Sequence, residues 1–287
     1  MKKFLFSVCA VLAIWGCGDD DRGLPCLSLS NCDICNKQIF NPSKEFCFGD
    51  TIYSKCGGRE YDPLAYQYCY NDTVKTYGTI SYGGQTYKTV VIGSQTWFAE
   101  NLNAGTSACY NNEPSNCAAY GKLYDWSTAM GFQSICNSNF CSSQIQSPHK
   151  GICPEGWHIP SNADWDELYR YVDGTNGTSS PYNSPTAGKY LKAMSGWKYC
   201  GPSDSGNTSL CEGAYGFSAL PGGYGHLDGR LGLLEYSGYW WSASEYNQVC
   251  NNNNNCAYHR TMKYLSDSAS WDYDSKLFLL SVRCIKN

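Results

Sequence analysis

The clearest helix in the chain is predicted by a stripe of apolar residues at helical spacing. The stripe consists of Trp165, Leu168, Tyr169 and Val172. Ser161 can cap the start of this helix with Asp164 three residues on, and Gly174 ends it. Asp164, Asp166 and Glu167 fall on the polar side, so we expect them to face solvent.

Two weaker helices are predicted on either side of it. The first ends at residues 130–131 and shows the helical spacing at Tyr120, Leu123, Tyr124 and Ser127. The second, shorter helix is expected over residues 186–194.

Short strands account for most of the remaining regular pattern. Residues 87–93 alternate weakly and predict a strand, which turns at residues 93–94 into the segment 95–102. Further strands are expected over residues 239–244, 258–265 and 277–285. In the last of these, Cys284 lies on the more apolar, buried face and Arg283 on the opposite face. Helices and strands do not alternate as in a βαβ array, so the fold class is α+β.

The N-terminal residues have the pattern of an export signal. Lys2 and Lys3 precede an apolar run over residues 4–15, which is too short to span a bilayer and has the length of a signal-peptide core. The run ends in Ile14-Trp15-Gly16-Cys17, which resembles a bacterial lipobox. We therefore expect Cys17 to carry the lipid that anchors the protein. The alternative is an ordinary signal peptide, with Cys17 as a stray thiol.

Acidic residues follow this cysteine directly, in Gly18-Asp19-Asp20-Asp21-Arg22. Two interpretations stay open: a surface-export tag of an outer-membrane lipoprotein, or a solvated tether. Removal of the signal peptide also removes Lys2 and Lys3, so the formal charge moves from −4 to −6. An acidic chain without a basic tract argues against nucleic acid as a partner.

A repeat of about twenty-one residues follows the acidic segment. It runs from Cys35 to Ile52 and again from Cys56 to Val74. Each copy contains a cysteine, an Asn-Pro or Asp-Pro turn, a second cysteine, and a short strand after it. Each copy is too small to bury a core, so an internal disulfide is expected to hold it. The repeats predict a stalk, with a small adhesive module as the alternative.

The chain contains 18 cysteines, and most of those after Cys17 fall into close neighbours. Such a content is typical of an exported, disulfide-braced protein. A zinc site at Cys32-Asp-Ile-Cys35 is the competing explanation there, but no second half-site matches it. The predicted close pairs are Cys26–Cys32, Cys35–Cys47, Cys56–Cys69, Cys109–Cys117, Cys136–Cys141, Cys200–Cys211 and Cys250–Cys256.

Two cysteines, Cys153 and Cys284, are left over when the neighbours are paired. Their pairing would join the entry of the clearest helix to the final strand. A long loop of this kind restricts the unfolded chain more than the short loops do.

Six sequence motifs occur in this order: Val91-Ile-Gly-Ser-Gln-Thr-Trp-Phe-Ala-Glu-Asn-Leu-Asn103, Tyr120-Gly-Lys-Leu-Tyr124, Cys153-Pro-Glu-Gly-Trp-His-Ile-Pro-Ser161, Gly216-Phe-Ser-Ala-Leu-Pro-Gly-Gly-Tyr224, Tyr239-Trp-Trp-Ser-Ala-Ser-Glu245 and Ser281-Val-Arg-Cys284. Together they resemble the Fibrobacter succinogenes major paralogous domain family over residues 86–287. The resemblance implies an exported protein without an assigned activity. It also implies a C-type-lectin-like fold, related to the sulfatase-modifying fold, in which a long disulfide like Cys153–Cys284 is common.

This resemblance completes the expected organisation. The expected fold has short helices, small antiparallel sheets and long disulfide-braced loops behind a cysteine-rich stalk. The parts are a lipoprotein signal peptide (1–16), an acidic tether (17–25), the cysteine-rich repeats (26–78) and the lectin-like domain (79–287).

The sequence contains no convincing motif for a catalytic site or for a metal site. Glu113-Pro114-Ser115 and Trp271-Asp272-Tyr273-Asp274 only partly resemble the calcium motifs of lectins. The cysteines have disulfide partners, so they are not nucleophiles. The histidines are scattered, and His158 is expected to be a hydrogen-bonded structural residue. We therefore expect no enzyme, no metal and no cofactor.

The aromatic residues carry the remaining functional signal. The chain has 24 tyrosines and nine tryptophans, whose apolar faces and polar edges suit contact with sugar rings. Packing of a loop-rich domain is the alternative use. Candidate ligand-binding residues in the second half are Tyr224, Tyr236, Tyr239, Tyr246 and Tyr258. We expect a lipid-anchored surface binding module of the outer membrane, for polysaccharide or for another surface protein. A structural envelope scaffold is the alternative.

Overall fold

The structure of the protein is a computed structural model. The chain forms two compact units, Met1–Thr76 and Tyr77–Asn287. The division falls two residues before the boundary expected from the sequence. The predicted signal peptide, Cys17, the acidic tether, Cys26 and Cys32 lie outside the described residues. Those described are 33–35, 38–40, 45–48, 51–61, 66–70, 72–200, 210–226, 228–250 and 254–287.

The first unit is built of β-hairpins, and two of them are the copies of the sequence repeat. In both copies the second cysteine lies in the first strand, opposite an aliphatic residue: Cys47 pairs with Ile52, and Cys69 with Val74. The strands predicted after the two cysteines are thus present, and the residues before them form the partner strands. The three hairpins are β1 (Asp33–Cys35) with β2 (Gln38–Phe40), β3 (Glu45–Phe48) with β4 (Thr51–Ser54), and β5 (Gln67–Tyr70) with β6 (Thr73–Thr76).

A disulfide braces the described part of this unit, as a two-stranded hairpin alone is marginal in water. Cys56 is wholly buried and is bonded to Cys69, with their Cα atoms 5.3 Å apart. Cys47 is also disulfide-bonded. The predicted pairs Cys26–Cys32 and Cys35–Cys47 involve side chains outside the described ones, so those two pairings stay predictions.

The second unit begins with a five-stranded antiparallel sheet in the order β10-β17-β9-β8-β7. The predicted strand and turn at residues 87–94 are confirmed. The sheet brings the end of the chain beside an early strand of this unit, because β17 lies between β9 and β10. Its strands are β7 (Gly78–Tyr82), β8 (Gln85–Ile92), β9 (Gln95–Phe98), β10 (Trp157–His158) and β17 (Ile285–Lys286).

The clearest predicted helix is confirmed as α3 (Asn162–Asp173). Ser161 and Asp164 form the capping box, and Gly174 ends the helix with a left-handed backbone. The predicted apolar stripe is buried. Glu167 is exposed, but the expectation for Asp166 was wrong: its carboxylate is buried and paired with Arg260 at 2.9 Å.

The predicted helix that ends at residues 130–131 is wrong in its first part. The chain forms α1 (Pro114–Tyr120) and then a new helix, α2 (Trp126–Met130). Gly121 has a φ of 79°, and Asp125 caps α2 by accepting a hydrogen bond from the Thr128 amide. Both features break the periodic pattern. The remaining helices are α4 (Ala187–Leu191), which is shorter than predicted, and the 3-10 turns η3 (Tyr110–Asn112), η4 (Ser134–Asn137) and η5 (Ser142–Gln144).

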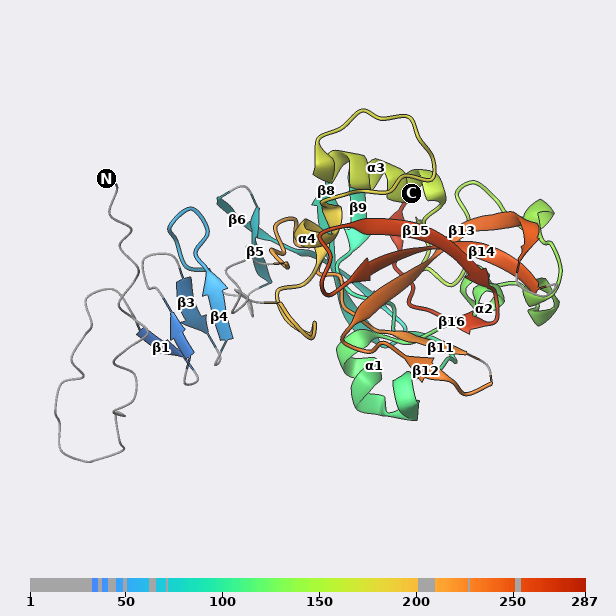
Figure 1. The fold of residues 1–287 in the computed structure, drawn as a ribbon, viewed down its shortest axis with the longest axis horizontal. Helices are drawn as coiled ribbons and strands as arrows, with labels where there is room; N and C mark the ends of the chain where they lie inside the picture. The colour runs from blue at the N-terminus through green and yellow to red at the C-terminus, as the bar shows by residue number, and fades with distance from the viewer. Residues whose placement is uncertain are drawn as a thin grey trace. The chain divides into compact units, whose positions relative to one another are not determined.

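Two three-stranded antiparallel sheets form the rest of the unit, in the orders β13-β14-β15 and β12-β11-β16. Figure 1 shows β13, β14 and β15 as long neighbouring strands, and α3 contacts β13. The strands are β11 (Tyr224–His226), β12 (Leu231–Gly232), β13 (Ser237–Cys250), β14 (Asn254–Lys263), β15 (Ala269–Ser275) and β16 (Phe278–Leu279).

The predicted final strand 277–285 is not one strand. β16 and β17 lie in different sheets, and the chain between them passes through the interior. Cys284 is buried as predicted, but Arg283 is also wholly buried. The alternation of side chains along a strand did not predict the burial of Arg283, because other parts of the protein cover both sides of this segment.

Disulfides tie the loops of the second unit to its core. Their Cα–Cα distances, from 5.0 to 6.1 Å, suit disulfide geometry. Together with Cys56–Cys69, six of the predicted pairs are therefore bonded among the described residues. Those of the second unit are Cys109–Cys117, Cys136–Cys141, Cys153–Cys284, Cys200–Cys211 and Cys250–Cys256.

Candidate functional site

The five tyrosines predicted to bind a ligand lie in three separate clusters. Tyr224 and Tyr239 contact each other edge to face, with ring centroids 5.9 Å apart. Tyr236 belongs to a second cluster, while Tyr246 and Tyr258 contact each other in a third. The structure therefore does not bring the five together.

Strand alternation decides which of these residues share a surface. On the sheet β13-β14-β15, Tyr239 lies opposite Thr261, and His259 opposite Asp272. Their side chains project on one face, and those of Tyr246 and Tyr258 on the other. We call these the front and rear faces of the sheet.

The central cluster consists of Tyr239 on the front face of β13, Tyr224 on β11 and Phe278 on β16. Tyr224 meets Phe278 edge to face at 5.6 Å, and all three rings are partly exposed. Burial raises the pKa of Tyr239, so its hydroxyl stays protonated and can donate a hydrogen bond.

Charged and imidazole groups border the central cluster on two sides. His259 lies 5.7 Å from the Tyr239 ring, and its Nε2 is 3.0 Å from an Asp274 carboxylate oxygen. At the other border, His226 contacts Phe278, and Asp228 pairs with Arg230 at 2.7 Å. Hydrogen bonds from Arg230 lower the pKa of Asp228 to about 2, so this carboxylate is ionised at neutral pH.

The turn cluster consists of Tyr199, Tyr236 and Tyr264, beside the turn after β14. Tyr199 stacks on Tyr264 at 5.6 Å, and Tyr264 meets Tyr236 edge to face at 5.1 Å. Tyr199 is 60% exposed and the neighbouring Leu265 63%. The Lys198 amine lies 5.8 Å from the centre of the Tyr236 ring. Tyr199 and Leu265 thus present a strongly exposed aromatic and apolar surface.

A strained turn presents Tyr236. Leu233 and Glu235 have φ values of 59° and 66°, in the left-handed region that bulky residues rarely adopt. Backbone hydrogen bonds hold the turn: the Lys198 amide donates to the Glu235 carbonyl, and the Tyr264 amide to the Tyr236 carbonyl.

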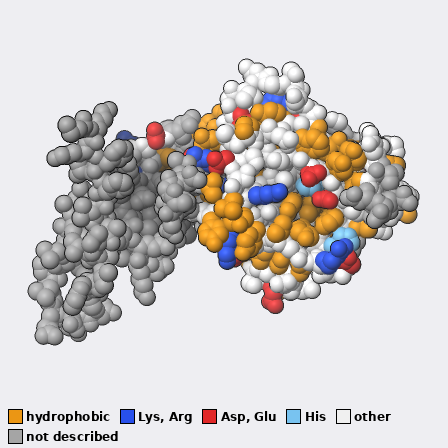
Figure 2. All heavy atoms as spheres, in the orientation of Figure 1, with side chains coloured by type: hydrophobic (Ala, Val, Ile, Leu, Met, Phe, Trp, Pro, Cys, Tyr) orange, Lys and Arg blue, Asp and Glu red, His pale blue; other side chains and the backbone are white. Residues whose placement is uncertain are grey.

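The two clusters lie along the same strands. Ser237, next to Tyr236, pairs with Lys263, and Tyr239 follows two residues later. Figure 2 shows hydrophobic side chains gathered near the end of β14 and again over β11 and β13, with basic, histidine and acidic side chains between and beside them. We call the two clusters with Lys263, Asp272 and Asp274 the aromatic face.

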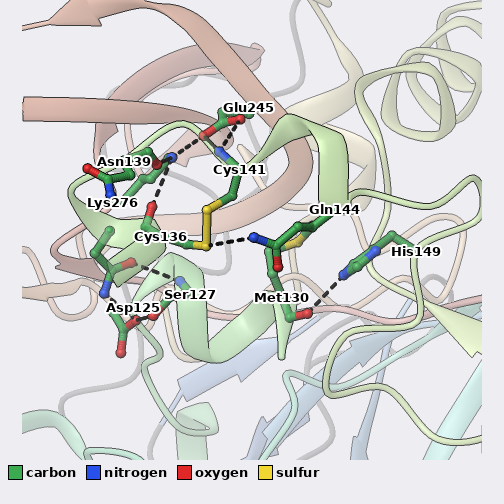
Figure 3. Close-up of a disulfide and its surroundings, with 11 residues drawn as sticks. Asp125, Ser127, Met130, Cys136, Asn139, Cys141, Gln144, His149, Glu245 and Lys276 are labelled. Atoms are coloured by element: carbon green, nitrogen blue, oxygen red, sulfur yellow. Dashed lines mark hydrogen bonds and ion pairs between the residues drawn. A yellow bond between two sulfur atoms is a disulfide. The ribbon is translucent and has the colours of Figure 1, made fainter. Parts of the chain in front are cut away.

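Several buried charges hold this framework and are not part of the face. The Lys276 amine contacts Glu245 and donates to the carbonyls of Cys136 and Asn139 at 3.0 Å (Figure 3). Glu245 also accepts from the Cys141 amide at 3.0 Å, so this ion pair braces both ends of a disulfide loop.

Arg283 is a further buried charge that the sequence did not reveal. It donates to the Asn101 side chain at 2.9 Å and to three backbone carbonyls, and it lies 4.5 Å from the Phe217 ring. Burial lowers the pKa of Arg283 to about 9. Its contacts join the final segment to β9 and to the chain before β11.

No cluster of His, Cys, Asp and Glu side chains that could hold a metal is present among the described residues. His158 is hydrogen-bonded as predicted, since its Nδ1 lies 2.8 Å from the Asn287 side chain and its Nε2 3.5 Å from Asp164. Every cysteine whose side chain is described is disulfide-bonded. Within the described helices, none is long and apolar enough to cross a membrane.

These features define a disulfide-braced α+β domain that carries an aromatic surface. The sequence matches the family described as the Fibrobacter succinogenes major domain over residues 90–286. The chain belongs to this family, whose biochemical function is unknown. Neither a curated protein nor a solved structure matches the chain.

Proposed function

We propose that this protein is a lipid-anchored surface protein that binds polysaccharide through the aromatic face. The observation that supports the proposal is the pairing of two aromatic clusters along one sheet. Tyr236 directly precedes β13 and Tyr239 lies near its start, so the two clusters lie at the same end of this sheet. An extended surface of this kind suits a linear glycan better than a single small sugar.

The groups around the clusters supply the polar contacts that a sugar needs. A tyrosine ring packs against the apolar face of a pyranose, and its hydroxyl can donate or accept a hydrogen bond. Asp272 and Asp274 can accept from sugar hydroxyls, and Lys263 can donate to them. The face carries both signs of charge, so we infer a neutral polysaccharide as the ligand.

The remaining parts of the proposal concern display. The export signal and Cys17 would anchor the chain in the outer membrane, and the hairpin repeats would form the stalk. A C-type-lectin-like fold is supported by Cys153–Cys284, which joins the entry of α3 to the end of the chain. We assign binding and not catalysis to the protein, because its described cysteines are disulfide-bonded and Lys276, Glu245 and Arg283 make structural contacts.

A protein partner is the second candidate ligand of the aromatic face. Leu265, at 63% exposure, and Leu233, at 44%, add apolar area to the turn cluster. Tyrosine and leucine in one exposed patch also suit a protein interface. This function would be favoured if the protein bound no glycan and if crosslinking on cells captured a surface protein at the aromatic face.

Replacement of Tyr199 and Tyr236 by alanine should reduce retention on insoluble cellulose, or on the best ligand of a glycan array, by about 10- to 100-fold. The two rings are the most exposed aromatic anchors of the face, and anchors of this type carry most of the binding energy. The full chain in detergent is measured by pull-down isotherms, with and without EDTA.

Tyr171→Ala is the matched control, because Tyr171 is 44% exposed on α3, outside the aromatic face. The control should bind as the wild type does, and EDTA should have no effect. Equal retention of the double variant and the wild type would refute the assignment of the face.

A further inference from the structure

The rear face of the same sheet carries a third aromatic cluster, formed by Tyr246, Tyr258, Trp271 and Tyr273. We call it the rear cluster. Tyr246 and Tyr273 stack nearly parallel, with centroids 3.9 Å apart and planes at 4°. Tyr258 meets Tyr246 edge to face at 5.5 Å, and Trp271 meets Tyr258 at 5.7 Å. The three strands thus supply one continuous group of rings.

The rear cluster differs from the buried part of the same face. Trp240 and Arg260 are wholly buried, and they contact Trp165 and Asp166 of α3. The rings of the rear cluster are partly exposed instead. These partly exposed rings can therefore contact a ligand from solvent.

A disulfide braces the strands that carry this site, and a polar group lies at its margin. The disulfide Cys250–Cys256 closes the β13–β14 hairpin, and Cys256 lies opposite Tyr246. The Tyr246 hydroxyl donates to the Gln248 side chain at 3.3 Å. Rings held in place in this way lose little freedom when a ligand binds.

We propose that the rear cluster is a second saccharide site, which takes a pyranose ring against Trp271 and Tyr246 and is independent of the aromatic face. Aromatic faces with hydroxyl and amide groups at their edges suit a neutral sugar. Tyr239 of the aromatic face and the rear cluster lie on opposite faces of one sheet, so one molecule can bind two glycan chains. The ligand class rests on the proposed function, whereas the location of the site does not.

Fluorine NMR of the full chain, labelled with 5-fluorotryptophan in detergent, tests the proposal. The Trp271 resonance is assigned with Trp271→Phe, and cellohexaose, xylohexaose and mannohexaose are the probes. We expect one of them to shift this resonance with saturation. The dissociation constant should stay within about 2-fold in Tyr199→Ala/Tyr236→Ala and should rise about 10-fold in Tyr246→Ala.

The outcomes separate this site from the aromatic face. A Trp271 resonance that no probe moves, in a protein that is retained on cellulose, overturns the second site and leaves the proposed function intact. A shift that disappears in Tyr199→Ala/Tyr236→Ala also overturns it, since only one site then exists. A shift at Trp271 without any effect of Tyr199→Ala/Tyr236→Ala on retention supports the rear site and refutes the aromatic face.

Discussion

Replacement of Cys153 and Cys284 by alanine should lower the free energy of unfolding by about 5 kcal/mol. The two residues are 131 positions apart, and in the chain-entropy model a loop of this length restricts the unfolded chain by about that amount. Both side chains are buried, and the bond fixes the entry of α3 to the final segment. Denaturant unfolding followed by circular dichroism measures the change.

The pair Cys109 and Cys117 is the matched control, because it closes a loop of only 8 positions. The same model assigns about 2.6 kcal/mol to a loop of this length. An equal or larger loss in the control variant would contradict the assignment of Cys153–Cys284 as the main covalent brace.

Removal of one partner of the buried pair Lys276 and Glu245 should cost about 3–5 kcal/mol, because the other charge is left without its counterion. Both side chains are almost inaccessible to solvent. We expect this loss for Lys276→Met and for Glu245→Gln. The double variant should lose less than the sum, because no buried charge remains in it.

An exposed pair serves as the control for this cycle. Lys150 and Glu155 are 3.6 Å apart, with side chains 57% and 94% exposed. Loss of this pair should change stability by less than about 1 kcal/mol. Additive losses in the Lys276 and Glu245 cycle would contradict the role of the pair as a unit.

Features fixed by local sequence were predictable. The helix α3 was found because its cap, its apolar stripe and its final glycine lie within fourteen positions, from Ser161 to Gly174. The two hairpin repeats were found because their copies agree in pattern. Cys153 and Cys284 were paired by elimination, which needs no structure.

Features that depend on distant parts of the chain were not predictable. The periodicity near Tyr124 predicted a helix, but its amide and carbonyl bond to Leu280, which is far away in the sequence. Arg283 was placed on a polar face, but its charge is met by carbonyls of other segments. A single sequence does not show that a charged residue of this kind is buried.

The candidate site was predictable only in its residue type. The excess of tyrosine predicted that aromatic rings contact the ligand. Which tyrosines lie together depends on the strand register and on the loops. Tyr264 lay in a predicted strand and could have been paired with Tyr236 once the register was known. Tyr199 lies in no predicted helix or strand, so nothing in the sequence placed it beside Tyr264.

Radical footprinting by mass spectrometry tests the central claim most directly, because it reports which side chains a glycan covers. The full chain in detergent is oxidised with and without the glycan that retains it best. We predict slower oxidation of Tyr199, Tyr236 and Leu265 in the presence of glycan, and an unchanged rate for Tyr171. Protection of Tyr171 with no change at Tyr199 and Tyr236 would contradict the claim that the aromatic face binds polysaccharide.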